Sequence, residues 1–336
     1  MAELDDFAAE ADRVSELEAT ARRLSAQLRK EKLRTESLVE AVYQAAHDAA
    51  LIAPKVKVPK PGKDKRKVRG EVALLHATDW QVGKHSDSYD TDKARARMRT
   101  LAEKVATIAD IQRAHHPVRE CVLMLGGDMI EGASIFPTQA FEIDSTVYEQ
   151  VFATAGITEQ LVSDLLATFE QVTVWDIHGN HGRIGRRGDL PALDNLDRIL
   201  YRIARDRMNE PRLTWNHADN WHQIVSIGEY AALLVHGDQI RSFGGNLPAY
   251  GIIKKVSAWK SGVLPPFRDA YLGHFHTHQA LNLAAGGHVF MTGSPESGNA
   301  YAAEFVAATG TPSQRLHFVD PERGRVTSEH QVFLDD

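Results

Sequence analysis

Five short polar clusters along the chain carry carboxylate, imidazole and amide side chains next to glycines. Each cluster follows a short apolar run, and together they hold the side-chain types that bind divalent metal ions in proteins. The clusters occupy residues 78–84 (Thr-Asp-Trp-Gln-Val-Gly-Lys), 126–128 (Gly-Gly-Asp), 178–182 (His-Gly-Asn-His-Gly), 236–238 (His-Gly-Asp) and 273–276 (Gly-His-Phe-His). Any one of them could be an ordinary capped loop, but five in succession indicate one shared site.

The chemistry that suits these side chains is the hydrolysis of a phosphoester by two metal ions. Two divalent cations about 3.5–4 Å apart can clamp one phosphoryl group between them. A bridging carboxylate offsets their mutual repulsion, and Asp128 is the candidate for that role. His274 and His276 alternate along an extended segment, so both side chains can face the metals. Mixed nitrogen and oxygen ligands are typical of manganese, iron or zinc sites.

The elements that must position these clusters are short buried strands alternating with amphipathic helices. Apolar runs predict strands over 72–77, 121–125, 172–177, 231–235, 270–272 and 288–291, and helices are predicted over about 92–115, 145–169 and 190–208. Asp189, followed by Leu190 and Pro191, predicts the start of the third helix. This alternation indicates an α/β fold with ligands at the carboxyl ends of its strands. We predict a two-sheet α/β sandwich with flanking helices over 71–336, closed by a β-hairpin around 321–324 on the second sheet.

Two segments precede the predicted domain. Residues 1–53 are predicted to form a helical extension with heptad spacing at Val14, Leu17, Ala21, Leu24 and Leu28. This helix is either a coiled coil that joins subunits into a homo-oligomer or an amphipathic helix that lies on its own domain. Residues 54–70 are predicted to be a basic linker, with eight Lys or Arg and one Asp between 55 and 69. The linker is either a solvated tether or a contact for a phosphate backbone.

The composition is that of a globular protein without a membrane segment. The chain has 336 residues and a formal net charge of −6, although its linker is basic. The acidic remainder argues against a broad nucleic-acid-binding face unless the linker or the metals supply the attraction. No apolar run approaches the ~20 residues of a membrane helix, and no signal peptide is evident. Cys121 is the only cysteine, and we expect a buried, inert thiol in a cytoplasmic protein.

The order of the five clusters resembles a known pattern. Asp-x-(His/Gln), Gly-Asp, Gly-Asn-His, His-Gly and Gly-His-x-His, in that order, are similar to the motifs of the calcineurin-like metallophosphoesterase superfamily. Within it, residues 75–83 (Leu-His-Ala-Thr-Asp-Trp-Gln-Val-Gly) look most like the opening of SbcD-type DNA repair exonucleases and phage-encoded relatives. The resemblance spans roughly residues 71–295, and it implies a metal-dependent hydrolase that cleaves phosphate esters.

The resemblance also implies a role for each matched residue. The first metal position would be formed by Asp79, Gln81 and His276, and the second metal position by Asn180, His236 and His274. Asp128 would bridge the two ions. His181 would contact the phosphate and act as general acid, or stabilise the leaving oxygen. The implied cofactors are two divalent ions, with Mn²⁺ favoured and Fe, Zn or Mg as alternatives.

Two positions depart from the family pattern. Gln81 stands where most members have histidine, and a neutral amide oxygen is a weaker ligand that favours harder ions such as Mn²⁺. The first metal position should therefore bind its ion less tightly than the second. Gly182 stands where Asp or Glu usually follows the Asn-His pair. This change removes an expected partner that would orient His181.

The substrate is the least constrained part of the prediction. Arg183 and Arg186 follow the third cluster and Lys84 and His85 follow the first, so these four are candidate contacts to substrate. With the basic linker they favour a DNA nuclease of exonuclease-like type. A phosphodiesterase or phosphatase acting on small nucleotides or phosphoproteins is the enzymatic alternative. A non-catalytic scaffold that keeps the fold is the third hypothesis.

Overall fold

The computed structural model describes residues 58–136, 138–185, 187–188, 190–240, 248–284, 286–296 and 311–335, together with scattered positions between 22 and 48. The chain divides into two compact units, 1–52 and 53–336, and the architecture described below is that of the second. All five positions of the heptad pattern lie outside the described residues. The coiled coil and the homo-oligomer therefore stay predictions.

The first sheet has six strands in the order β11-β10-β1-β2-β3-β4. Four strands run parallel: β1 (Glu71–Ala77), β2 (Val118–Leu125), β3 (Gln171–Asp176) and β4 (Leu213–Asn216). The antiparallel pair β10 (Ser313–Asp320) and β11 (Arg325–Phe333) completes the sheet next to β1. All residues of β1 and β10 are buried. The pairing of these two strands therefore lies inside the domain and not at an edge of the sheet.

The second sheet has five strands in the order β5-β6-β7-β9-β8. Its strands are β5 (His222–Ile227), β6 (Tyr230–Val235), β7 (Asp269–Leu272), β8 (Gln279–Asn282) and β9 (His288–Met291). Strands β6, β7 and β9 are parallel, so their carboxyl ends lie at the same edge. Between the two sheets, Leu74 and Met124 pack with Leu234, Tyr271 and Phe290 in one buried cluster.

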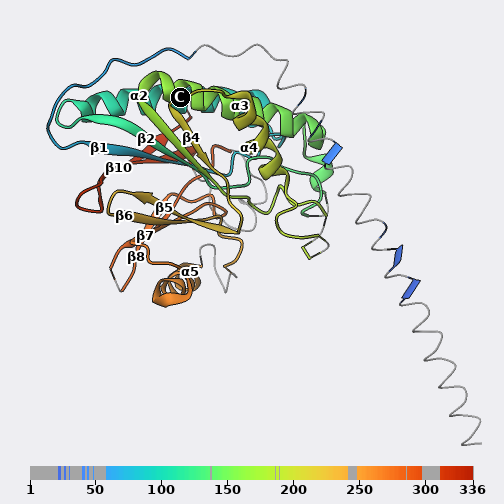
Figure 1. Cartoon of the computed structure of the whole chain (residues 1–336). Helices are drawn as coiled ribbons and strands as arrows, with labels where there is room; N and C mark the ends of the chain where they lie inside the picture. The colour runs from blue at the N-terminus through green and yellow to red at the C-terminus, as the bar shows by residue number, and fades with distance from the viewer. Residues whose placement is uncertain are drawn as a thin grey trace, which may run out of the picture. The chain divides into compact units, whose positions relative to one another are not determined.

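Helices flank both sheets (Figure 1). Helices α2 (Thr91–Arg113), α3 (Val147–Thr168) and α4 (Leu196–Arg207) cover the outer face of the first sheet, and α5 (Ala249–Ala258) lies against the second. A short 3₁₀ turn, η1 (Gln139–Phe141), precedes α3, and a π-helical turn, η2 (Trp259–Val263), extends α5. Each long helix begins at a side-chain cap, with Asp90 before α2 and a Thr146–Glu149 capping box before α3. The predicted α/β class with two sheets and flanking helices is confirmed.

Two details of the prediction are wrong. The hairpin β10–β11 forms, but it belongs to the first sheet, where Leu316 pairs with Leu75, and not to the second. The third helix does not begin at Asp189, because Asn195 caps it and Leu196 is its first residue. Cys121, by contrast, is buried in β2 as predicted, and burial raises the pKa of its thiol, which keeps it unreactive.

The described part of the basic linker, residues 58–70, lies on the domain and is called the basic strap below. The backbone N–H of Asp64 donates to Glu170 Oε1 at 3.0 Å, and Arg119 Nε donates to the Asp64 carbonyl at 2.9 Å. Arg69 forms an ion pair with Asp320. These contacts fasten the strap at the amino ends of β2 and β3, so this stretch is not a free tether. Its lysines Lys60, Lys63, Lys65 and Lys67 are exposed.

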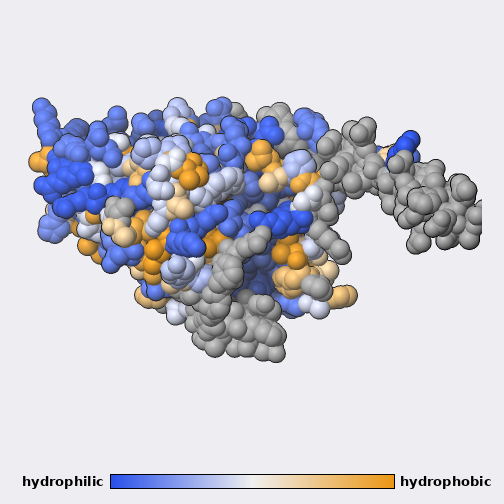
Figure 2. All heavy atoms as spheres, turned by 90° about the horizontal axis from the view of Figure 1, so that it is seen from below, coloured by the Kyte–Doolittle hydropathy of each residue, from blue (hydrophilic) through white to orange (hydrophobic). Residues whose placement is uncertain are grey.

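The surface is polar with scattered apolar groups. On the face shown in Figure 2, apolar residues form several separate groups among hydrophilic ones. Tyr250 in α5 and Val263 in η2 are among the exposed large apolar side chains. In the described part of the chain, no helix is both long and apolar enough to cross a membrane.

Candidate metal centre

The five polar clusters follow the carboxyl ends of five parallel strands. Those in the first sheet follow β1, β2 and β3, and those in the second follow β6 and β7. Backbone contacts join the clusters directly, since Asp79 N–H donates to the Gly127 carbonyl at 3.0 Å and Gly273 N–H to the His236 carbonyl at 2.9 Å. One site is therefore assembled where the carboxyl edges of the two sheets meet.

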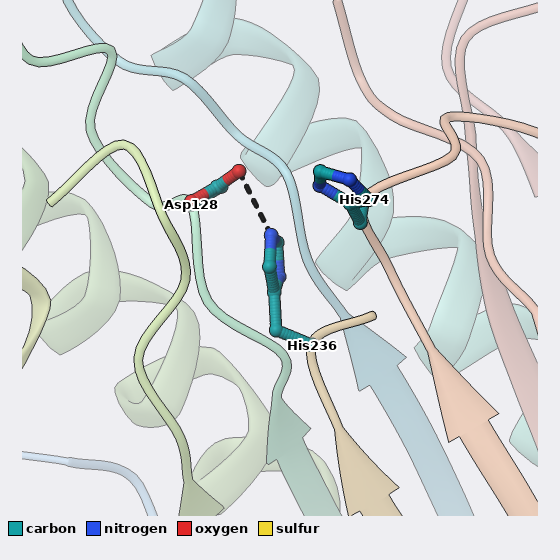
Figure 3. A group of neighbouring side chains, drawn as sticks. All are labelled: Asp128, His236 and His274. Carbon is teal, nitrogen blue, oxygen red and sulfur yellow. Dashed lines mark ion pairs between the residues drawn. The ribbon is translucent and has the colours of Figure 1, made fainter. Parts of the chain in front are cut away.

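Asp128, His236 and His274 point toward one another (Figure 3). Their ligand atoms all lie within 4.8 Å of one another, and His236 Nε2 is 2.9 Å from Asp128 Oδ2. The amide oxygen of Asn180 lies 3.2 Å from the same Nε2. These four side chains are the set predicted for the second metal position together with the bridging carboxylate.

The hydrogen bonds of His236 leave one ring nitrogen for a cation. Its Nδ1 lies 2.8 Å from the Gly126 carbonyl, which can only accept, so Nδ1 carries a hydrogen. Nε2 then faces two oxygens, and this arrangement is favourable only with a proton or a metal ion between them. Burial lowers the pKa of His236, but the Asp128 carboxylate outweighs it and raises the pKa to about 10. A metal ion would displace that proton.

His274 is prepared for a metal in a different way. Burial lowers the pKa of its ring to about 4, so the imidazole is neutral at physiological pH and keeps a lone pair. Its ring lies edge-on to that of His236, with 5.2 Å between centroids. Its backbone N–H donates to both carboxylate oxygens of Asp79, at 2.9 and 3.0 Å. The donor set of the second metal position therefore fits a divalent ion.

The remaining predicted ligands are those assigned to the first metal position. Asp79 is fully buried, and its Oδ1 lies 3.5 Å from His276 Nε2. Gln81 is buried as well, and its amide oxygen has no hydrogen-bond partner among the described residues. A buried carbonyl oxygen without a partner costs about 1–3 kcal/mol, which a bound cation would offset. The donor set here also fits a divalent ion.

Backbone conformation marks the same residues independently. Among the described residues, five non-glycine residues have positive φ angles: Asp79, Gln81, Asp128, His274 and His276, with φ between 46° and 65°. Each is a predicted metal ligand. The left-handed region costs an ordinary residue roughly 1–2 kcal/mol. Strain of this kind concentrates at functional sites, where it aims side chains that a regular strand end would direct elsewhere.

Glycines allow the clusters to approach one another closely. A Cβ atom on Gly179 would lie 2.0 Å from Asp128 Oδ1, and one on Gly273 would lie 2.4 Å from Asp79 Oδ2. Neither contact is sterically possible unless the carboxylate moves from its place. The two glycines are thus required by the position of the carboxylates, which explains their place within the motifs.

His181 lies beside the candidate metal ligands, and hydrogen bonds and close contacts fix both its backbone and its ring. Its backbone N–H donates to Asp128 Oδ1 at 2.7 Å, and its Nδ1 lies 2.8 Å from the Glu131 carbonyl and 3.3 Å from Gln139 Nε2. Burial lowers the pKa of the ring, but the carboxylates of Asp128 and Glu131 raise it to about 9. In the metal-free protein the ring is therefore a proton donor at neutral pH.

The departure at Gly182 has a structural reason. A Cβ atom there would lie 2.3 Å from Asn195 Oδ1, so a larger residue would displace the cap of α4. The acid that usually follows the Asn-His pair is replaced by Glu131, whose Oε2 lies 3.4 Å from His181 Nδ1. A carboxylate three residues after the second cluster thus lies beside the His181 ring and can orient it.

Asn195 and Asp197 are structural residues of the site that the sequence prediction missed. Asp197, in the first turn of α4, is fully buried and accepts the backbone N–H groups of Asp128 at 3.0 Å, Met129 at 3.2 Å and Gly179 at 2.9 Å. Asn195 donates from its amide to the Gly179 carbonyl at 2.9 Å. An Asn cap with Asp two residues later is a signal for a helix start that could have located them.

Replacement of Asp197 by alanine should loosen the site and the fold together. Three buried N–H groups would lose a carboxylate acceptor, so we expect a loss of about 3 kcal/mol or more in the free energy of unfolding. Chemical denaturation measures it. Asp194→Ala, three residues earlier, is the matched control and should change stability by less than about 0.5 kcal/mol. Equal stability of the two variants would contradict the assigned role of Asp197.

The four candidate substrate contacts have different environments. Lys84 is buried and forms an ion pair with Glu296, and Arg183 Nη2 lies 3.4 Å from Asp238 Oδ2. His85 is exposed. Arg186 lies outside the described residues. The assignment of all four to substrate stays a prediction.

Comparison with known proteins gives weak similarities only. No family model matches the chain, and no curated protein matches it. A single mutant of Vps29 from Entamoeba histolytica is 11% identical, with 77% of this chain and 98% of that chain covered and a TM-score of 0.36. A predicted phosphoesterase from Streptococcus pneumoniae is 11% identical, with 79% and 99% covered and a TM-score of 0.31. The phosphopantetheinyl hydrolase PptH from Mycobacterium tuberculosis is 11% identical, with 78% and 100% covered and a TM-score of 0.33. Similarities at this level carry no argument, so the function must be inferred from the site itself.

Proposed function

We propose that this protein is a metal-dependent phosphodiesterase of the calcineurin-like metallophosphoesterase superfamily. One observation carries the proposal: among the described residues, every non-glycine residue with a left-handed backbone is a candidate ligand, and two of them, Asp128 and His274, form a close group with His236. An ordinary loop cluster has no reason to concentrate this strain on two carboxylates, two imidazoles and an amide.

In this function the chain holds two ions and positions one proton. The first ion would be held by Asp79, Gln81 and His276. The second ion would be held by Asn180, His236 and His274. Asp128 would bind both ions. When bound, two divalent ions supply Lewis-acid polarisation of the phosphoryl group. His181 directs Nε2 into the site, 3.4 Å from Gln81 Nε2, while the Glu131 carbonyl holds Nδ1. From this position His181 would donate a proton to the leaving oxygen.

DNA is the proposed substrate. The basic strap supports this choice only for DNA long enough to reach both places, because it lies at the amino ends of β2 and β3, the opposite edge of the first sheet from the site. Its lysines Lys60, Lys63, Lys65 and Lys67 are exposed and have no ion-pair partner among the described residues. Phe141 also supports it: this ring is 90% exposed and lies two residues after Gln139, which touches His181. An exposed aromatic ring beside a hydrolytic site can stack on an unpaired base.

Small nucleotides are the second candidate, and one observation favours them. Lys84, in the first cluster, and Arg183, next to the third, both face acidic partners. These two described cations are therefore partly neutralised and would grip a long phosphate backbone less strongly. This alternative would use the same residues for catalysis on a shorter substrate.

A turnover panel tests the proposal. Metal-free protein is loaded with Mn²⁺ and offered single- and double-stranded DNA, a cyclic nucleotide, and an aryl phosphate diester. We expect release of nucleotides from DNA and loss of turnover on chelation. Cleavage of the cyclic nucleotide alone would favour the second candidate. Absence of turnover together with absence of bound metal would favour a non-catalytic scaffold.

The basic strap gives a separate prediction for DNA binding. Changing Lys60, Lys63, Lys65 and Lys67 to glutamine should weaken binding of duplex DNA by metal-free protein and reduce the slope of log K against log salt by up to about 3.6. Fluorescence anisotropy over a salt series measures this. Hydrolysis of the aryl diester should stay unchanged. Lys93→Gln with Lys254→Gln, which removes two exposed charges outside the strap, is the control, and a strap variant limited to Lys63→Gln with Lys65→Gln matches it in charge. An unchanged salt slope in the strap variant would exclude the strap as a DNA contact.

A further inference from the structure

A second carboxylate lies directly behind His276. Glu296 is 5% exposed, and its Oε2 lies 3.4 Å from His276 Nδ1. The opposite ring nitrogen, Nε2, faces Asp79 Oδ1 at 3.5 Å. The imidazole therefore has one carboxylate on the metal side and another on the far side. Apart from this approach, Oε2 has no hydrogen-bond partner among the described residues.

Glu296 is fixed in place by contacts that do not involve His276. Its other oxygen, Oε1, forms a buried ion pair with Lys84. Its backbone N–H donates to Ser294 Oγ at 2.9 Å, and Ser294 Oγ donates to the Asp79 carbonyl at 2.7 Å. The loop that carries Glu296 is thus tied to the peptide of another ligand of the first metal position. A carboxylate held this firmly can orient the ring in front of it.

We propose that Glu296, held by Lys84, is a positioning residue that keeps His276 aimed at the first metal position; this inference rests on the proposed function. Glu296 would accept the Nδ1 hydrogen, which fixes the tautomer and leaves the Nε2 lone pair for the metal. Carboxylate partners of this kind also make the imidazole a stronger ligand. Lys84 then acts on the metal site through Glu296.

This arrangement offsets the departure at Gln81. A neutral amide stands where the family has an imidazole, so the first metal position has one strong nitrogen ligand fewer. Strengthening His276, the imidazole that remains there, partly restores the lost affinity. The chain therefore needs Glu296 more than it would with histidine at position 81. The second metal position does not touch Glu296 in any described contact and should be independent of it.

Titration of Mn²⁺ into the full-length, metal-free protein tests the inference without any substrate. Free Mn²⁺ is followed by its electron paramagnetic resonance signal in wild type, Glu296→Gln and Glu296→Asp. We expect two bound ions in wild type and an affinity for one of them that falls about 10–100-fold in Glu296→Gln, with the other unchanged. Glu296→Asp keeps the negative charge, so its affinity for this ion should lie between those of wild type and Glu296→Gln. Glu103→Gln, on the exposed face of α2, is the control.

A double-variant cycle separates positioning from a general effect. His276→Ala should bind the weaker ion less tightly than Glu296→Gln does, and adding Glu296→Gln to it should lower that affinity no further. Two Mn²⁺ bound with wild-type affinity by both Glu296 variants, or an equal loss in the His276→Ala background, would overturn this inference and leave the proposed function standing. No Mn²⁺ bound by wild type would overturn both.

Discussion

Replacing Asp128 by alanine is expected to remove phosphodiesterase activity and metal binding together. Asp128 is the proposed shared ligand of both positions, and its oxygens contact His236 Nε2 at 2.9 Å and the His181 N–H at 2.7 Å. Without the Asp128 carboxylate, two positively charged metal ions would have to bind close together with no bridging anion between them. Loss of metal polarisation is worth several kcal/mol, so kcat should fall by at least about 10³-fold. Turnover and bound manganese per chain are measured on the same samples.

Two controls make the Asp128 result specific. Asp128→Asn keeps the shape and an acceptor for the His181 N–H but lacks the charge, so it should bind metal poorly while folding normally. Asp238→Ala removes a carboxylate from the same region that is not a predicted ligand, and it should keep both ions. If Asp128→Ala retained two manganese ions, the proposed bridge would be wrong.

Replacing His181 by alanine should produce a different defect. The metals should remain bound, because no metal ligand is lost, but the proton donor for the leaving oxygen is removed. On DNA, whose leaving group is a poor alkoxide, kcat should fall by about 10²–10⁴-fold. On an aryl diester with a good leaving group the fall should be much smaller, because that oxygen needs no proton. Rates on both substrates are compared at saturating Mn²⁺.

The role of His181 is tested by comparing the fall in kcat on DNA with the fall in kcat on the aryl diester. Gln139→Leu removes one contact to the same ring and should show a weaker form of the same pattern. Equal losses on DNA and on the aryl diester would assign His181 to binding rather than to proton donation. Loss of metal in His181→Ala would mean that this residue supports the metal centre instead.

The five polar clusters could be predicted from sequence because each follows a short strand whose residues are mostly buried or partly buried. Such strands appear as uninterrupted apolar runs, and all six predicted ones overlap strands of the structure. Strands β4, β5 and β8 were missed because partly exposed residues interrupt their apolar pattern. The sheet that receives β10–β11 could not be predicted, since local sequence specifies a hairpin but not its distant partner β1.

Residues that support the ligands could not be found by the same reasoning. Glu131 and Glu296 make contacts between segments far apart in the chain, and nothing in their local sequence distinguishes them from ordinary acids. Asp197 has a local signal, its place two residues after the Asn195 cap, but that signal indicates a helix start and not a contact to Asp128 or Gly179. The start of α4 was predicted too early because proline is also common at the first position of a helix, and Pro191 precedes the true cap, Asn195. The orientation of His181 was placed in doubt by Gly182 alone, although a buried acid three residues after Asp128 supplies the contact.

Anomalous diffraction from crystals grown with MnCl₂ measures the two-metal centre most directly. Data at the manganese edge should give two peaks per chain about 3.5–4 Å apart. One should lie among Asn180, His236 and His274, the other beside Asp79, Gln81 and His276, with Asp128 between them. The absence of a peak at these residues, or a single ion bound elsewhere while Asp128 stays paired with His236, would contradict the assignment of this protein as a two-metal phosphodiesterase.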